Sequence, residues 1–177
     1  MFTVAIEHSL IEHCKNILAK HNFGKRYTAN GTKEQQLTGI IGQSVIMNLF
    51  NIGYVDGTSG FDNGVDLVYN NKTIDVKTMG RTTRVKANYT NNFLKLQDYF
   101  KTDVYIFCSY HKIKNVLTVC GWISKPDFVK KRRFYPKGST RTRTDKTIFT
   151  TFADLYEIDN VDLNNVNSIT DLKKQLK

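Results

Sequence analysis

The pattern of apolar and polar positions in the N-terminal part of the chain predicts two helices. Residues 4–20 carry apolar side chains at the spacing of one helix face: Leu10, Ile11, Cys14, Ile17 and Leu18. A second helix is expected over residues 33–51, which are apolar on most sides. Thr32 and Gln35 have the spacing of a capping box at its start. The pattern thus predicts an amphipathic helix followed by a buried one.

The second predicted helix contains two glycines, Gly39 and Gly42. Each glycine costs a helix interior about 0.5–1 kcal/mol relative to alanine. We therefore expect this helix to lie close against another backbone. Gln43 shares the face of Gly39, and a buried glutamine needs hydrogen-bond partners.

A β-hairpin is expected in VDLVYNNKTIDVKT, residues 65–78. Asn70 and Asn71 tolerate the positive φ that a two-residue hairpin turn requires. If these two residues form the turn, Leu67 lies opposite Ile74 on an apolar side.

The same register sets Val65 opposite Val76 and brings two carboxylates, Asp66 and Asp75, face to face on the other side. Lys77 is two residues beyond Asp75 and points the same way. Like charges directly opposite one another destabilise a strand pair, and a bound cation would reverse that effect. The alternative is a solvated polar face on which Lys77 screens both acids.

The remaining pattern predicts a helix over 91–100, strands over 103–110 and 115–123, and a helix that starts at Ser124 with Pro126 in its first turn. Residues 146–158 suggest a strand and a short helix, and 168–176 a final helix or a frayed tail. This order favours an α/β or α+β fold, a mixed sheet flanked by helices.

The chain length of 177 residues suits a single domain, 1–177, with a core at about 32–123, a basic segment at 125–146 and a C-terminal tail at 160–177.

The net charge of +10 indicates a polyanionic partner, most often nucleic acid and less often an anionic membrane surface. Residues 125–146 hold nine Lys or Arg against two Asp, interleaved with aromatic side chains. A compositional bias toward Lys, Asn and Ile is the alternative explanation, but it accounts less well for clustered arginines.

The cysteines and the N-terminal residues indicate where in the cell the protein is expected. Cys14, Cys108 and Cys120 are odd in number and show no zinc-ligand spacing, so reduced thiols in an intracellular, cytoplasmic protein are expected. Glu7 and Glu12 interrupt any signal-peptide core, and no apolar run reaches membrane-spanning length. We expect no membrane association.

The hairpin residues carry a recognisable chemistry. Asp66, followed on the next strand by Asp75-Val76-Lys77, resembles the PD-(D/E)XK nuclease signature, with Val65 in place of the proline. Residues 39–43, Gly-Ile-Ile-Gly-Gln, are similar to the GxxGE helix that precedes the hairpin in many members. The resemblance covers about residues 32–110 and implies a restriction-endonuclease-like core.

The resemblance also implies roles for these residues. Asp66 and Asp75 would bind Mg²⁺, with Mn²⁺ as an alternative cation, and Lys77 would support attack of water on a phosphodiester. The family's helix acid falls on Gln43, which brings an oxygen but no charge. Glu7 or Asp62 could supply a third acid, although a helix-terminal and a turn-forming role respectively are the simpler explanations.

Nucleic-acid contacts are expected from cations that flank this site and from the basic segment. The expected set is Arg81, Arg84, Lys130, Lys131, Arg132, Arg133, Lys137, Arg141 and Arg143. The sequence thus predicts a Mg²⁺-dependent DNA endonuclease acting on duplex or branched DNA, with a homodimer as a possible state. A non-catalytic nucleic-acid-binding protein on a decayed nuclease fold and an RNA-processing nuclease are the alternatives.

Overall fold

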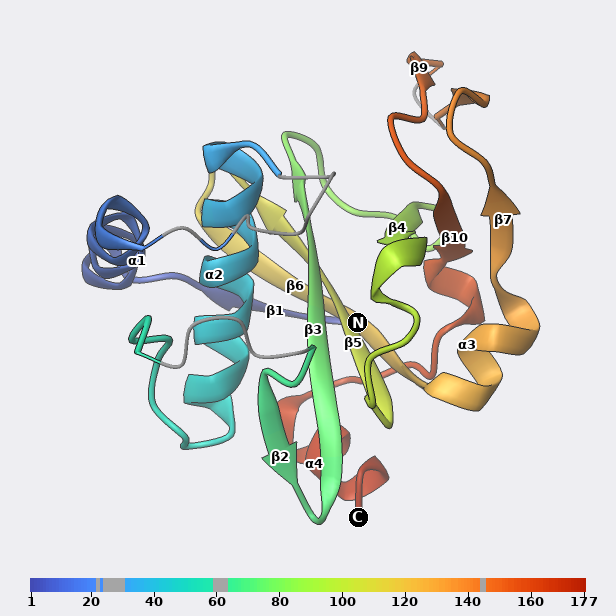
Figure 1. Cartoon of the computed structure of the whole chain (residues 1–177). Coiled ribbons are helices and arrows are strands. Elements are labelled where there is room, and N and C mark those ends of the chain that lie inside the picture. The colour runs from blue at the N-terminus through green and yellow to red at the C-terminus, as the bar shows by residue number, and fades with distance from the viewer. Residues whose placement is uncertain (22, 24–30, 59–63, 144–145) are drawn as a thin grey trace.

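The computed structural model describes residues 1–21, 23, 31–58, 64–143 and 146–177, and a five-stranded mixed sheet forms its centre (Figure 1). In spatial order the strands are β1 (Phe2–Ala5), β6 (Val116–Ser124), β5 (Val104–His111), β3 (Lys72–Arg81) and β2 (Leu67–Tyr69). β3 and β5 run parallel, and the other neighbours pair antiparallel. The mixed α/β class predicted from the sequence is thus confirmed.

Two different layers cover the two faces of this sheet (Figure 1). Helix α2 (Lys33–Leu49) packs on one face, with α1 (His8–Lys20) beside it. The other face meets a three-stranded sheet of β4 (Thr90–Leu94), β10 (Leu155–Asp159) and β7 (Arg133–Tyr135), together with α3 (Lys125–Lys131). We call these the helical layer and the second sheet.

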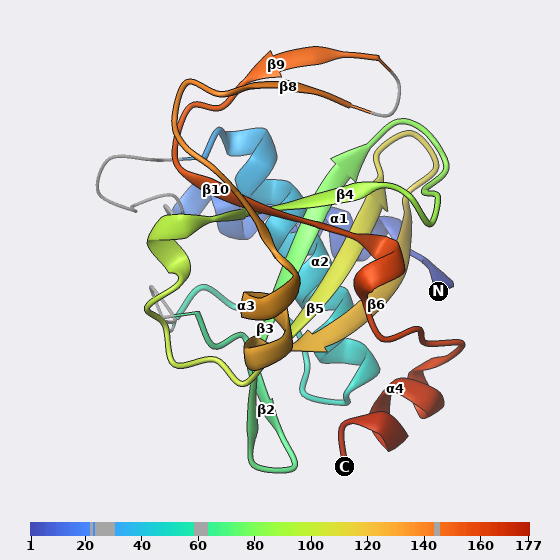
Figure 2. The same cartoon turned by 90° about the vertical axis from the view of Figure 1, so that its right-hand side faces the viewer.

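Smaller elements complete the described chain. β8 (Thr140–Thr142) and β9 (Ile148–Thr150) form a two-stranded ribbon that projects from the second sheet (Figure 2). Two 3-10 turns, η1 (Lys95–Gln97) and η2 (Asn160–Asp162), follow β4 and β10. Helix α4 (Ile169–Gln175) ends the chain. None of the helices in the described residues is both long and apolar enough to cross a membrane.

Helix α2 is fixed by a local signal at its start and by close packing along its length. The Thr32 side chain accepts from the Gln35 backbone N–H and the Gln35 side chain accepts from the Thr32 N–H, so the predicted capping box is confirmed. A Cβ on Gly42 would lie 1.9 Å from Thr78 Oγ1 on β3, whereas a Cβ on Gly39 would meet nothing within 4 Å. The expectation of close approach is therefore right for Gly42 and wrong for Gly39.

The β2–β3 hairpin forms with the predicted turn. Asn70 and Asn71 have φ of 47° and 61°, and Leu67 pairs with Ile74. The regular ladder ends there, because the Asp66 N–H also donates to the Ile74 carbonyl, at 2.9 Å. The predicted Val65–Val76 and Asp66–Asp75 pairs were therefore wrong.

Two other expectations need correction. Residues 91–100 form β4 and η1 rather than a helix, because β4 pairs along its whole length with β10. Residues 146–158 contain strands β9 and β10 without the expected short helix, and β1 was not anticipated. Fully buried apolar side chains also lie outside 32–123, among them Cys14, Ile158 and Leu172.

Candidate functional site

The Asp75 and Lys77 side chains lie on the face of β3 that meets the second sheet. Alternate residues of a strand point to opposite faces. Ile74 and Val76 pack with the helical layer, so Asp75 and Lys77 point the other way. Lys77 Nζ lies 2.6 Å from Asp75 Oδ2, and the two side chains are 15% and 3% exposed. The predicted alignment of this acid and this lysine is confirmed as a buried ion pair.

Aromatic residues surround this ion pair. Lys77 Nζ lies 5.4 Å from the centre of the Phe93 ring of β4, and Tyr105 of β5 pairs with Asp75 across the parallel ladder. Burial, followed by the Asp75 charge, raises the pKa of the Tyr105 hydroxyl well above its usual range. That hydroxyl is buried without a hydrogen-bond partner among the described residues. The low-polarity surroundings strengthen electrostatic interactions at the pair.

Asp66 approaches the same part of β3 from its edge. Its Oδ2 accepts a hydrogen bond from the Val76 backbone N–H at 2.6 Å. This N–H belongs to the peptide bond between Asp75 and Val76. The Asp66 carboxylate therefore lies beside that peptide bond at the sheet edge, whereas the Asp75 side chain extends from the face of the sheet. Sequence reasoning thus placed the acids together but by the wrong geometry.

The residue predicted as the third metal ligand, Gln43, lies elsewhere. Gln43 belongs to α2, in the helical layer, and α2 covers the face of β3 opposite Asp75 and Lys77. Glu7 occupies the N-cap position of α1 and is exposed. Asp62 lies outside the described residues. Asp66 and Asp75 are thus the two predicted carboxylates that the structure brings to one place.

The donor chemistry of these two acids suits a hard divalent cation. Carboxylate oxygens are the ligands that Mg²⁺ prefers, and Mg²⁺ commonly takes one or two of them together with waters and phosphate oxygens. No group of three or more His, Cys, Asp or Glu side chains with metal-binding geometry exists within the described ranges. The two carboxylates alone suit a cation that keeps most of its coordination shell for water or substrate.

Several cations predicted to contact nucleic acid instead make internal ion pairs. Arg132 Nη1 contacts Asp98 Oδ1 at 2.5 Å, and the Arg132 guanidinium stacks 3.7 Å from the Tyr156 ring centre. Arg133 pairs with Asp159 at 2.9 Å. These arginines connect the end of α3 and the start of β7 to β10 and to the turn after η1.

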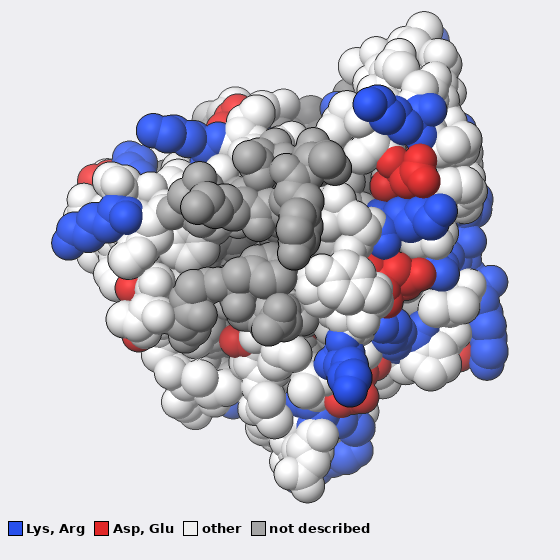
Figure 3. Space-filling model, in the orientation of Figure 1, with Lys and Arg blue, Asp and Glu red and all other residues white. Residues whose placement is uncertain are grey.

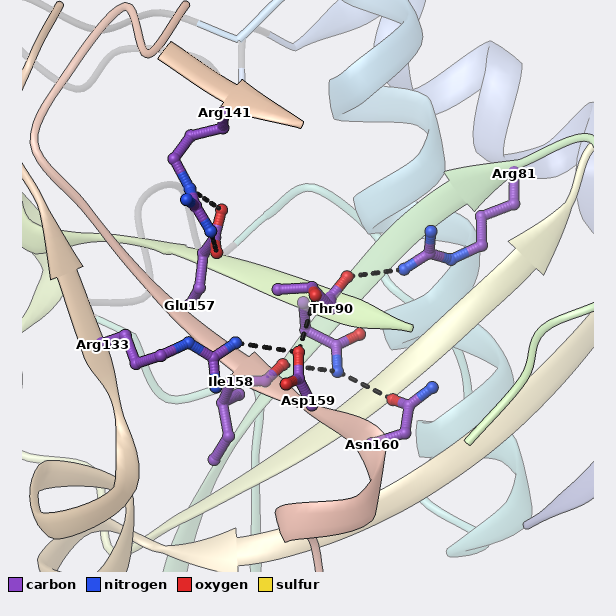
Figure 4. Close-up of polar contacts among 9 residues, drawn as sticks. Arg81, Thr90, Arg133, Arg141, Glu157, Ile158, Asp159 and Asn160 are labelled. Atoms are coloured by element: carbon purple, nitrogen blue, oxygen red, sulfur yellow. Dashed lines mark hydrogen bonds and ion pairs between the residues drawn. The ribbon is translucent and has the colours of Figure 1, made fainter. Parts of the chain in front are cut away.

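A polar network extends along β10 (Figure 4). Arg141 donates to both carboxylate oxygens of Glu157, at 3.3 and 2.8 Å. Asp159, which accepts from Arg133, also accepts from the Thr90 hydroxyl at 2.6 Å. Arg81 donates to the Thr90 carbonyl at 2.7 Å, so the network reaches the end of β3. Glu157 and Asp159 were not predicted; their alternate positions in the β10 sequence are the signal that could have found them.

The other predicted cations are mostly at the surface. Lys130 lies 3.6 Å from Asp127, and Lys131 donates to the Asp162 carbonyl at 2.8 Å. Arg84, Lys137 and Arg143 are exposed. Figure 3 shows basic and acidic side chains interleaved on the side of the second sheet. The basic segment is therefore partly neutralised by acids that lie far from it in the sequence.

Comparisons of the chain with family models, with curated proteins and with solved structures found no match. Functional inference therefore depends on the geometry of the site.

Proposed function

We propose that the chain is a Mg²⁺-dependent nuclease that hydrolyses phosphodiester bonds of DNA and has a restriction-endonuclease-like core. The observation that carries this proposal is the position of Asp66, which accepts from the Val76 N–H directly after Asp75, together with Lys77 2.6 Å from Asp75. Two carboxylates and one ammonium in a largely buried setting form a compact set for phosphate chemistry.

Each residue has a distinct role in the proposed reaction. Asp66 and Asp75 would hold Mg²⁺, which when bound supplies positive charge to phosphate oxygens and lowers the pKa of water. Lys77 carries three N–H donors on an ammonium that lies over the Phe93 ring, so it can orient a water or a phosphate oxygen while paired with Asp75. Tyr105 and Phe93 exclude bulk water from the pair and so strengthen these electrostatic contacts.

The fold supports the same reading. The Asp75-x-Lys77 strand is the second strand of a hairpin, follows a buried helix, and is joined by a crossover to a parallel strand, β5. The helix and the hairpin agree with the expectation from the sequence resemblance, whereas β4 and η1 stand where a second helix was expected. The Gly42–Thr78 approach accounts for one glycine of the helix motif.

A second candidate function is non-catalytic nucleic-acid binding. Two observations favour it: the Asp75 side chain is 3% exposed and already paired with Lys77, and Gln43 lies in the helical layer rather than at the acids. An RNA nuclease would use the same residues and differ only in substrate.

A cleavage assay tests the proposal. Purified chain is incubated with single-stranded, duplex and branched DNA, and with RNA, in Mg²⁺, Mn²⁺ or EDTA. We expect metal-dependent cleavage of DNA that Asp75→Asn abolishes while DNA binding persists. Asp162→Asn, the same chemical change in η2, serves as the control and should cleave as the wild type does. Binding without cleavage of any substrate would favour the second candidate.

A further inference from the structure

Basic residues gather at the end of the central sheet where β3 and β5 finish. Arg81 and His111, the last residues of these parallel strands, are paired, and the Lys112 N–H donates to the Arg81 carbonyl at 2.9 Å. The loop after β3, residues 82–89, and the turn after β5, residues 112–115, therefore lie side by side. Figures 1 and 2 place the β8–β9 ribbon at this same end of the molecule.

We call these three segments the basic end: residues 82–89, residues 112–115 and the described part of 139–151. Every charged side chain in their described residues is basic: Arg84, Lys86, Lys112, Lys114, Arg141, Arg143 and Lys146. Two of them are neutralised, Lys112 by Glu34 at 2.6 Å and Arg141 by Glu157 at 2.8 Å. The other five are exposed and form no ion pair with an acid in the described ranges.

Arg141, which is paired with Glu157, fixes the orientation of the ribbon. Arg141 lies in β8, its guanidinium is 3.7 Å from the Tyr135 ring centre, and it donates to Glu157, whose side chain is 5% exposed. The β10 network continues through Asp159 and Thr90 to Arg81 (Figure 4). The ribbon and the β3 loop are thus attached to the same strand, so their exposed cations keep a defined spacing.

The outer face of the ribbon differs from its attached face. Arg141 pairs with Phe149 on the attached face, and Arg143 lies over the Phe149 ring at 4.8 Å. On the outer face Thr142 pairs with Ile148, which is 67% exposed. Hydroxyl and methyl groups on a two-stranded ribbon match the major groove of DNA, which admits such a ribbon and presents base edges and thymine methyls.

We propose that the basic end is the docking surface for duplex DNA, with the β8–β9 ribbon in the major groove and with Arg84, Lys86, Arg143 and Lys146 at the phosphates. This inference rests on the proposed function and adds the surface and the form of the nucleic acid. It also revises the expected contact set, because Arg132, Arg133 and Arg141 serve the fold.

The main test compares two quadruple variants with equal charge change. One is Arg84→Gln/Lys86→Gln/Arg143→Gln/Lys146→Gln. The control is Lys20→Gln/Lys101→Gln/Lys174→Gln/Lys177→Gln, whose sites are exposed and lie away from the basic end. Affinity for a fluorescent duplex is measured by anisotropy in EDTA over a series of salt concentrations, and thermal unfolding confirms that both variants fold.

The expected result follows from counterion release. Removing four phosphate contacts should flatten the slope of log K against log salt by about 3.6 and weaken binding on the order of 100-fold. The control should lose less than about 3-fold, because screening removes charge effects beyond about 8 Å at physiological salt. Equal losses in the two variants, or no loss in the first, would overturn the proposal.

A cross-linking measurement tests the ribbon itself. Thr142→Cys on the ribbon and Thr170→Cys on α4 are each labelled with a thiol-reactive photo-cross-linker, since Cys14, Cys108 and Cys120 are buried. Cross-linking to duplex DNA is expected from position 142 and not from position 170. Equal yields, or wild-type binding that is tighter to duplex RNA or to anionic lipid vesicles than to duplex DNA, would contradict the assignment.

These measurements separate the two proposals because they use no divalent metal. A chain that binds duplex through the basic end but never cleaves would remove the nuclease proposal alone. A chain that cleaves normally with all four cations replaced would remove the docking surface alone.

Discussion

The two layers around the central sheet are built from different interactions. The helical layer joins β3 through apolar side chains such as Ile41 and Ile74 and through direct contact between Gly42 and Thr78. On the face toward the second sheet, the same strand carries an ion pair, Asp75–Lys77, beside the rings of Phe93 and Tyr105. One strand therefore has a face that stabilises the fold by packing and a face that holds charge in low-polarity surroundings.

The proposed function would account for this difference. Burying a charge pair stabilises a fold less reliably than burying apolar groups of the same size. Stability alone is therefore a weak explanation for a buried acid and lysine on the face toward the second sheet, and the proposed chemistry would supply another. The predictions below test each layer in turn.

The largest effect is expected from removing the cation of the buried pair. Lys77→Met leaves the Asp75 carboxylate, 3% exposed, without its partner. The expected loss in free energy of unfolding is about 3–5 kcal/mol. Urea denaturation at neutral pH measures it. The double variant Asp75→Asn/Lys77→Met should recover most of the loss, and a double variant no more stable than the single one would contradict the account.

The next largest effect concerns the helical layer. Gly42→Ala places a Cβ 2.8 Å from Thr78 Cβ as well as against its hydroxyl, so about 1–3 kcal/mol of destabilisation is expected. Gly39→Ala, one turn earlier and in open space, is the matched control and should stabilise the helix by about 0.5–1 kcal/mol. Thermal unfolding of both variants checks the pair. Equal effects of the same sign would refute the packing described for α2.

A third prediction separates an arginine that anchors the β8–β9 ribbon from one that is proposed to face DNA. Arg141→Gln removes two charge-assisted hydrogen bonds to the buried Glu157 and should cost about 1.5–3 kcal/mol. Arg143→Gln, two residues away and exposed, should leave stability unchanged within about 0.5 kcal/mol. Chemical denaturation of each variant decides the matter. A larger loss for Arg143→Gln than for Arg141→Gln would reverse the assignment.

The smallest effect lies in the sheet itself, outside both layers. Hydrogen bonds from the Thr73 N–H and then the Thr73 hydroxyl lower the pKa of Asp103 below its ordinary value of 3.8. This stability is present above the ordinary pKa and is lost as pH falls through the lower folded-state pKa. Asp103→Asn should therefore cost less than about 1 kcal/mol at pH 7, since the group is exposed.

The pH series supplies the check on this last prediction. The difference between wild type and Asp103→Asn should shrink as the pH falls below 3.8. A difference that stays constant across that range would mean that the carboxylate charge contributes nothing to the connection between β3 and β5.

The helical layer and the β2–β3 hairpin could be predicted from sequence because their signals are local. The capping box at Thr32 and the Asn70–Asn71 turn each depend on a few adjacent residues. The second sheet depends on partners far apart in the chain, such as Asn91 and Asn160, whose side chains bond at 2.8 Å. No pattern within residues 91–100 indicates that pairing.

The candidate site likewise has features that local sequence predicts and features that depend on distant residues. The alternation of side chains along one strand placed Asp75 and Lys77 on one face. The position of Asp66 depends on an irregular end to the β2 ladder, and the neutralised arginines depend on acids of β10. Counting charge along the chain cannot find such pairs.

The central claim is that Asp66 and Asp75 together hold a divalent cation. Titration calorimetry of the chain with Mn²⁺, in the absence of nucleic acid, tests it most directly, with Asp66→Asn, Asp75→Asn and the control Asp103→Asn measured alongside. We predict one binding event in the wild type and the control that is lost in both site variants. A wild type that binds no metal, or binding that survives in both site variants, would contradict the claim.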